Sequence, residues 1–194
     1  ILVSGFCLPL SSHPVQRGVE VSLAGLAVTM VTLAVMPAAR IVFGVLTCIG
    51  AAMILCGLAQ PLFARLAQHA AVAGSVCFLL FLVTKHVPDG YIGIAGWTLA
   101  ELPSAWYADL VTTFFGLPAP DFFSADYFPL FPWLFLFATG FFLYHLLAAR
   151  GALRFFVRGH SRLLEWAGRH SLWIYLLHQP LCLGLTLLLV RLLG

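Results

Sequence analysis

Residues 130–149 read LFPWLFLFATGFFLYHLLAA, an apolar run that contains no Asp, Glu, Lys or Arg. An α-helix rises about 1.5 Å per residue, so roughly 20 such residues cross the hydrocarbon core of a bilayer. The stretch therefore predicts a membrane-spanning helix. The same pattern recurs in three further windows: Val19 to Pro37, Ile41 to Ala59, and Ser171 to Val190.

A fifth window, from Leu66 to Thr84, is less clear because Gln68 and His69 lie near its start, where we expect them at the membrane interface. The chain opens with Ile1 and without an initiator Met, and its first apolar stretch ends within the run Ser11 to Pro14. We therefore expect about five complete spans, a partial first one and a truncated N-terminus.

Composition leads to the same class of protein. Of the 194 residues, 62% are hydrophobic and 9% are charged, and the mean hydropathy is +1.02. These values are typical of an integral membrane protein and not of a soluble domain. The sequence predicts an all-α, polytopic transmembrane helix bundle that forms a single domain over residues 1–194.

Charge and cysteine usage exclude other classes. The net charge is +3 without a long basic run, which argues against nucleic acid as a partner. The cysteines form no CxxC pair and have no His at metal-ligand spacing, so we expect neither disulfides nor a bound metal. They are interpreted as small buried apolar residues within hydrophobic stretches: Cys7, Cys48, Cys56, Cys77 and Cys182.

The distribution of Lys and Arg predicts the orientation, because positive residues near span ends are retained on the cytoplasmic side. If the basic loop at about 150–169 is cytoplasmic, alternation of the spans places Arg17 and Arg65 on the same side. The opposite side then carries fewer positive residues: Arg40, Lys85 and Arg191. We therefore expect a multi-pass protein in the cytoplasmic membrane, with the lipid bilayer as its partner.

The outer connection, at about 85–129, is long and rich in Gly, Pro and aromatic residues. Such length indicates a function or independent packing. Two interpretations stay open. The aromatic side chains can form an interfacial belt or a folded cap on the headgroups, or the connection can act as a lid over a cavity.

Polar residues in the last window form one helix face. Ser171, Tyr175, His178 and Cys182 follow one another at steps of four, three and four residues. An ionisable group within a span persists mainly where it faces other helices or water. His178 can therefore transfer a proton in a polar cavity, or, with Gln179, simply tie this helix to a neighbour by hydrogen bonds.

Asp126 and Tyr127 precede the span 130–149, which starts with two prolines, at Pro129 and Pro132. Asp126 can cap the helix that follows, where a carboxylate favours the positive end of the helix dipole. Alternatively, Asp126 and Tyr127 line the outer mouth of a substrate cavity.

Three motifs together resemble the heparan-alpha-glucosaminide N-acetyltransferase catalytic domain family. They are SADYFPLFPW at 124–133, GRHSLWIYLLHQP at 168–180 and FGVLTCIG at 43–50. The first is the most specific, since the ending YLLHQP also occurs in the wider group of membrane acyltransferases. Thr47 stands where family members usually have His, and a threonine cannot serve as a general base.

The resemblance implies a membrane-bound acetyl- or acyltransferase that uses acetyl-CoA or another acyl-CoA and a sugar or glycan acceptor outside the cytoplasm. It implies His178 as the catalytic residue, with support from Tyr175 and Ser171. Acceptor binding is expected from a second group, and coenzyme A binding from Arg169 of the basic loop. The acceptor group is Asp126, Tyr127, Trp133 and Gln179.

Two readings from other classes remain. The same polar stripe can serve a transporter in envelope glycan export, although paired broken helices, which favour transporters, do not recur in two halves of the sequence. A structural membrane subunit is the other. A homo-oligomer is possible under each reading.

Overall fold

The computed structural model describes residues 1–94, 97–154 and 162–193, and within the last range part of the side chains only. The chain divides into two compact units, Ile1–Leu153 and Arg154–Gly194. Each unit is described by itself. The single domain over residues 1–194 therefore stays a prediction.

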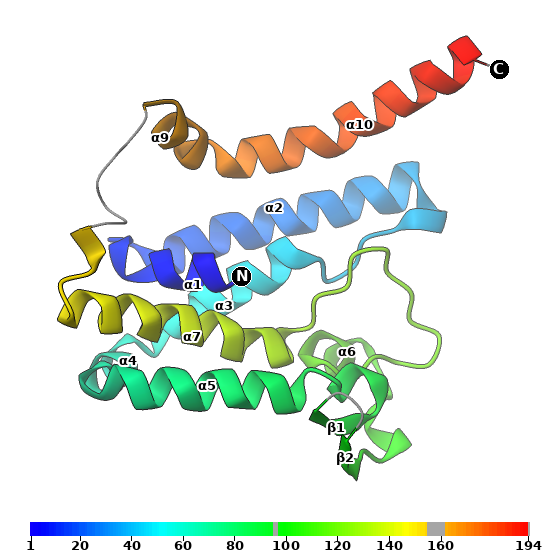
Figure 1. Ribbon diagram of the computed structural model, residues 1–194. Helices are drawn as coiled ribbons and strands as arrows, with labels where there is room; N and C mark the ends of the chain where they lie inside the picture. The colour runs from blue at the N-terminus through cyan, green and yellow to red at the C-terminus, as the bar shows by residue number, and fades with distance from the viewer. Residues whose placement is uncertain (95–96, 155–161, 194) are drawn as a thin grey trace. The chain divides into compact units, whose positions relative to one another are not determined.

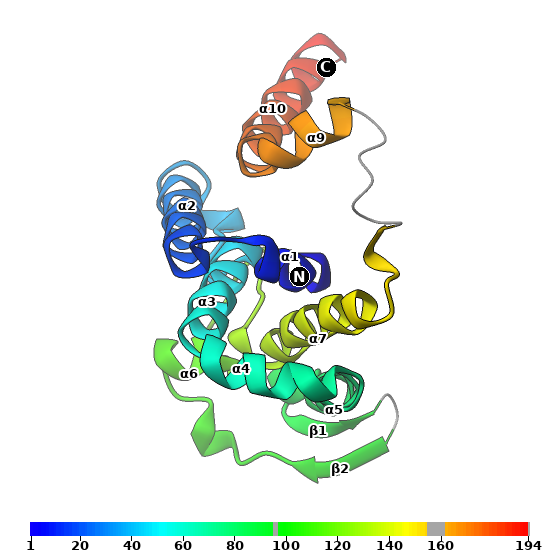
Figure 2. The same ribbon diagram turned by 90° about the vertical axis from the view of Figure 1, so that its left-hand side faces the viewer.

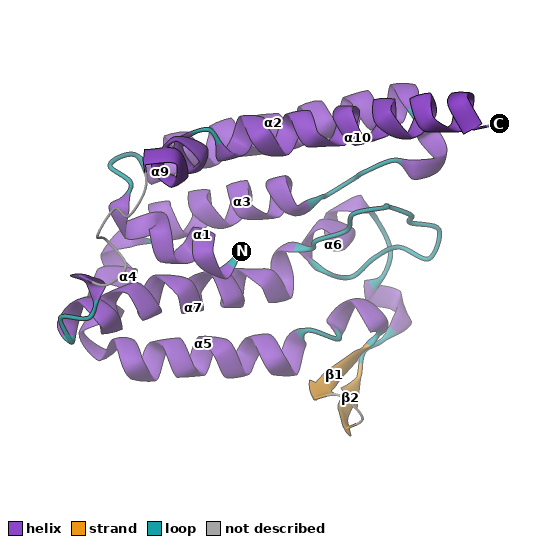
Figure 3. Ribbon diagram, turned by 45° about the horizontal axis from the view of Figure 1, so that its top comes forward, coloured by secondary structure: helices purple, strands orange, loops and turns teal. Residues whose placement is uncertain are grey.

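Unit 1 is a bundle of helices (Figure 1). Its helices are α1 (Leu2–Cys7), α2 (Pro14–Val35), α3 (Val45–Leu58), α4 (Gln60–Leu66), α5 (Ala70–Thr84), α6 (Leu110–Phe115) and α7 (Leu130–Ala149). Helix α2 packs against α3, and α7 contacts α1, α3 and α5. Figure 3 shows α2, α3, α5 and α7 of this unit running alongside one another, with the outer connection gathered at one end.

Glycines permit the closest helix contacts. A Cβ at Gly140 of α7 would collide with the backbone carbonyl oxygen of Leu2, and a Cβ at Gly5 of α1 with that of Phe137. Backbones that approach this closely gain dispersion energy and are common where helices associate in membranes. Gly5 and Gly140 thus allow the close contact between α1 and α7.

The buried core of unit 1 is small and aromatic. Phe137 and Phe142 of α7 are almost inaccessible, together with Ala52 and Cys56 of α3. The ring of Phe63 from α4 stacks on that of Phe142 at 5.4 Å between centroids. Most large apolar side chains of α2 and α5 face outward instead. This outward apolar surface is what a helix surrounded by lipid presents.

Three helical segments among the described residues are long and apolar enough to cross a membrane: Pro14–Val35, Gln60–Asp89 and Leu130–Ala149. Helix α3 is shorter, at 14 residues. The window Ser171 to Val190 forms helix α10 (Ser171–Leu193). The protein is thus mostly helical with three candidate spans, and the count of about five stays a prediction.

Helix α3 starts four residues later than the apolar window predicted. The backbone from Arg40 to Gly44 is not helical, and Phe43 there has a φ of 55°. This segment pairs with a distant part of the chain. The backbone N–H groups of Ala125 and Phe128 donate to the carbonyl oxygens of Arg40 and Phe43 at 3.0 and 2.9 Å. Helix α2, by contrast, starts earlier than predicted, at Pro14, a residue well suited to the first helical turn.

The all-α prediction misses a short hairpin in the outer connection. Strand β1 (Tyr91–Ile94) pairs with β2 (Trp97–Glu101) in antiparallel fashion, with Ile94 opposite Trp97. Helix α6 follows, and Asp109 caps it by accepting a hydrogen bond from the backbone N–H of Thr112 at 2.8 Å. This bond lowers the pKa of Asp109. The connection therefore has packing of its own.

The basic ends of the helices in unit 1 coincide. Arg17 lies in the first turns of α2, Arg65 near the end of α4, and Arg150 directly after α7. Figure 1 shows that the start of α2, helix α4 and the end of α7 share one end of the unit. Lys85 follows the opposite end of α5. The fold thus gathers these three arginines at the end away from the outer connection.

The described residues 162–193 of unit 2 form α9 (Arg162–Arg169) and α10, joined at His170. The backbone N–H of His170 donates to the carbonyl oxygen of Trp166 at 3.1 Å, and the His170 carbonyl accepts from Ile174 at 2.9 Å. The helical hydrogen bonds therefore continue across the junction. The predicted basic loop at 150–169 ends in a helix, and Arg158 lies outside the described residues.

Candidate functional site

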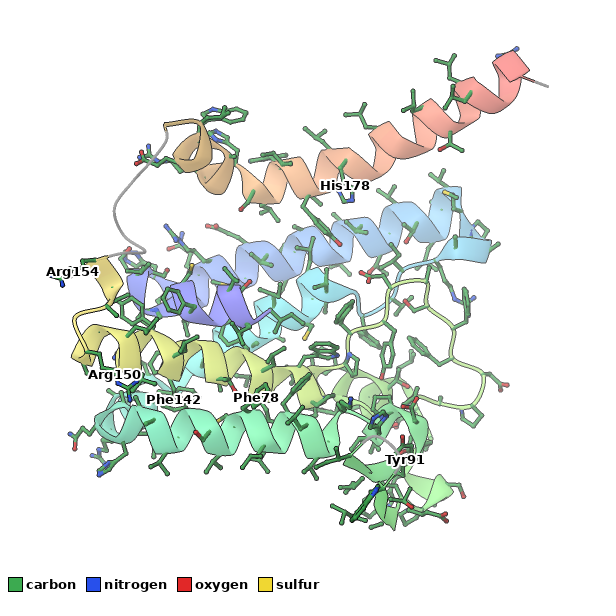
Figure 4. The ribbon with its side chains drawn as sticks, in the orientation of Figure 1. Phe78, Tyr91, Phe142, Arg150, Arg154 and His178 are labelled. Atoms are coloured by element: carbon green, nitrogen blue, oxygen red, sulfur yellow. The ribbon has the colours of Figure 1, made fainter. Side chains whose placement is uncertain are left out.

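His178 lies exposed on α10, one turn after Tyr175 (Figure 4). Its Nδ1 is hydrogen-bonded to the carbonyl oxygen of Tyr175. A carbonyl only accepts, so Nδ1 carries the proton, and in the neutral ring Nε2 keeps its lone pair. The two rings lie 5.1 Å apart between centroids. The imidazole therefore presents a proton acceptor that its own helix orients.

The other predicted residues of this helix fall where the spacing placed them. Ser171 starts α10 and is exposed, and Tyr175 is half-buried. Arg169 is exposed at the end of α9. The side chain of Gln179 lies outside the described residues. The arrangement allows proton transfer at His178, while the roles of Ser171, Tyr175, Gln179 and Arg169 stay predictions.

Asp126 caps a helix, but a different one from the helix that follows it in sequence. Its Oδ2 accepts a hydrogen bond from the backbone N–H of Val45 at 3.3 Å, at the start of α3. Its neighbour Ser124 accepts one from Val42 N–H at 3.0 Å. A Cβ on Gly44 would stand 3.0 Å from the Asp126 carboxylate, so Gly44 leaves room for this approach.

We call the paired segments Arg40–Val45 and Ser124–Pro129 the outer seam. It joins the start of α3 to the start of α7 through the backbone and side-chain bonds just described. The thiol of Cys48 adds a contact of 3.6 Å to the carbonyl oxygen of Pro129. The motif SADYFPLFPW is thus the place where two distant parts of the chain meet.

Tyr127 and Trp133 point to other neighbours. The hydroxyl of Tyr127 donates to the carbonyl oxygen of Thr113 in α6 at 2.6 Å. Burial raises the pKa of Tyr127, and the nearby phenol of Tyr107 adds to the effect. The Trp133 ring lies 5.3 Å from that of Phe81 in α5. Asp126, Tyr127 and Trp133 thus contact α3, α6 and α5, and acceptor binding by them stays a prediction.

Thr47 faces the neighbouring helix. Its Oγ1 lies 2.7 Å from the position that a Cβ on Gly25 of α2 would take. The side chain is half-buried between α2 and α3. Position 47 therefore contributes to the contact of these two helices.

The sequence interpretation missed His86, which follows α5 at the outer end of unit 1. Its Nδ1 lies 3.0 Å from Oδ2 of Asp89, and its ring stacks on Tyr91 at 4.9 Å between centroids. Among the described residues, nothing hydrogen-bonds its buried Nε2. The pattern His-x-x-Asp-Gly-Tyr at residues 86–91 was the available signal.

The described helices are apolar on their outer faces, and three arginines lie at one end of unit 1. A long apolar helix also carries an oriented imidazole. These features are those of a helical membrane protein with a residue that can transfer a proton. Comparison with known proteins gives the family. The sequence model for the catalytic region of heparan-alpha-glucosaminide N-acetyltransferase matches residues 1–180, and the chain belongs to this family. No curated protein and no solved structure shows significant similarity.

Proposed function

We propose that the chain is a membrane-bound acyltransferase, which transfers an acetyl or other acyl group from a coenzyme A thioester to a sugar or glycan acceptor outside the cytoplasm. The family match over residues 1–180 carries this proposal. It covers both the outer seam and the first part of α10 with His178. Membership indicates an acetyltransferase-like role in a membrane, and the donor and acceptor belong to the proposal.

His178 supplies the chemistry in this proposal. Its Nε2 accepts the proton from the acceptor hydroxyl or amine as that group attacks the thioester carbonyl. The new C–O or C–N bond forms, the C–S bond breaks, and the coenzyme A thiolate leaves and takes up a proton. The bond from Nδ1 to the Tyr175 carbonyl supports this role because it keeps Nε2 free to accept.

Arginine binds the donor in this proposal. Arg169 is exposed at the end of α9, and a guanidinium can hold a phosphate through two parallel hydrogen bonds. In the proposed topology this end faces the cytoplasm, where positive residues are retained. The membrane is the cytoplasmic membrane and the chain passes it several times. Homo-oligomerisation stays a prediction under this proposal.

Binding of acetyl-CoA tests the proposal. The full-length protein in detergent is titrated with acetyl-CoA by calorimetry, and thioester loss is followed after addition of a mixture of envelope sugars. Saturable binding that Arg169→Ala weakens, together with acceptor-dependent thioester loss, is the expected result. Arg191→Ala is the matched control, since Arg191 lies in the last turn of α10.

Two results would contradict the proposal. Absence of binding at millimolar acetyl-CoA would favour a transporter or a structural subunit. Equal weakening by Arg169→Ala and Arg191→Ala would show that binding reflects overall positive charge, and the assignment of Arg169 to coenzyme A would fail.

A further inference from the structure

The outer connection consists of two parts that differ in packing. In the part from Thr112 to Pro129, Thr113 is fully buried and its hydroxyl accepts a hydrogen bond from the Ala119 N–H at 3.0 Å. The rings of Phe114 and Phe122 lie against Phe43 at 5.4 and 6.2 Å between centroids. We call this packed part the cap; it ends in the Ser124–Pro129 half of the outer seam, and its exposed large apolar side chains are Phe115 and Phe123.

The part formed by residues 91–94 and 97–111 exposes several large apolar side chains, and we call it the wing. Every residue of β2 is exposed, and the side chain of Trp97 is 81% accessible. Clustered exposed apolar side chains of this kind mark a surface that contacts a partner or a membrane. The other large ones are Ile94, Leu99, Trp106, Leu110 and Val111.

The wing continues the apolar surface of α5. Strand β1 follows α5 after one short turn and contacts it. Helix α5 itself exposes Val72, Val76 and Leu79 along its length. Figure 2, which looks along the helices, shows the hairpin beside α5, on the side of unit 1 away from α2. A bilayer that surrounds α5 therefore meets the wing at the end of this helix.

The backbone sets the depth of the wing. A hairpin of two strands has unpaired N–H and C=O groups on both outer edges, and such groups are not tolerated in the hydrocarbon core. Glu101 ends β2, and Asp89 precedes β1. The headgroup region offers water to these polar groups and an apolar boundary to the tryptophans, which are enriched there.

We infer that the wing lies on the membrane at headgroup level beside α5, with Trp97 and Leu99 inserted toward the acyl chains. The partner is thus the lipid surface, and the wing does not cover a cavity. The inference requires that α5 crosses the membrane, and it is independent of the acyltransferase reaction.

Spin-label accessibility tests this depth. The full chain is prepared with its cysteines replaced by alanine and reconstituted in nanodiscs. A nitroxide is attached to Trp97→Cys or, as the matched control in the cap, to Asp121→Cys, which is also exposed. We expect the label at position 97 to collide more often with oxygen than with a water-soluble nickel chelate, and the label at 121 to show the reverse order.

Two outcomes would overturn the inference. A label at position 97 that prefers the nickel chelate would place the wing in water. A label that is inaccessible to both reagents would place it against protein, either another part of the protein or a second copy.

Fluorescence quenching supplies a second measurement if the cysteine-free protein does not fold. Brominated lipids quench tryptophans within the bilayer, and we expect Trp97→Phe to remove a larger quenchable fraction than Trp133→Phe. Trp133 is the comparison because it is half-buried between α7 and α5. A Trp97→Phe variant that keeps the full quenchable fraction of the wild type would contradict insertion of Trp97.

Discussion

His178 has a neighbour that allows a controlled test at the scale of one residue. His170, at the junction of α9 and α10, likewise holds its Nδ1 close to a carbonyl oxygen, that of Trp166, at 2.9 Å. Replacement of either ring by glutamine removes an imidazole that is tied to its own helix. Only His178 lies where the proposed reaction needs a base.

We expect His178→Gln to lower the rate of acyl transfer by about 10²- to 10⁴-fold, since a positioned general base contributes this much. Acetyl-CoA binding, measured on the same preparation, should be unchanged. His170→Gln should retain most of the rate. Full transfer activity in His178→Gln would remove His178 from the mechanism.

Tyr127 predicts a response to alkaline pH. Its hydroxyl bond to Thr113 requires the protonated phenol, and burial raises its pKa above the ordinary value. The folded state thus holds this proton more tightly than the unfolded chain. The resulting stability is fully present below the unfolded pKa of about 10 and is lost as pH rises above it.

Tyr127→Phe should destabilise the protein by about 0.5–1.5 kcal/mol at neutral pH, because it removes one buried hydrogen bond. The variant should also lose less of its melting temperature than the wild type above pH 10, which is about the pKa of an unperturbed phenol. Thermal unfolding in detergent between neutral and alkaline pH measures both effects. An alkaline decline of the same size in wild type and variant would contradict the assignment.

Between helices, the contact of α1 with α7 depends on the absence of a side chain. We expect Gly140→Ala to cost about 1–3 kcal/mol, because its Cβ would collide with the Leu2 carbonyl oxygen, which is backbone and cannot turn away. Gly74→Ala is the matched control: its Cβ would meet only the Phe142 side chain, at 3.2 Å. Thermal unfolding compares the two. Equal melting temperatures would show that α1 can shift without cost.

The elements that could be predicted are those that depend on local sequence. Apolar length predicted helices at 130–149 and 171–190, and both are present as α7 and α10. The start of α3 could not be predicted in this way, because Asp126, some 80 residues away, sets it. The hairpin was missed for another reason: aromatic and β-branched residues next to a span fit a strand and an interfacial loop equally well.

At the scale of the whole molecule, the sequence predicted a helical membrane protein and its family. It predicted much less completely which residues contact one another in the candidate site. The resemblance rests on short motifs, and the family match confirms it. Spacing along one helix aligned Ser171, Tyr175 and His178. Spacing could not show that Asp126, Tyr127 and Trp133 contact three different helices, since each partner lies in a separate segment.

The outer seam also bears on how the sequence can change over generations. Two of its bonds join backbone to backbone, from Ala125 to Arg40 and from Phe128 to Phe43, so these two bonds do not depend on which side chains stand at positions 125 and 128. A change of length is different. One residue inserted or deleted between Ser124 and Pro129 would shift the pairing and move Asp126 away from Val45. Substitutions at Ala125 should therefore be tolerated far more readily than insertions or deletions in this segment.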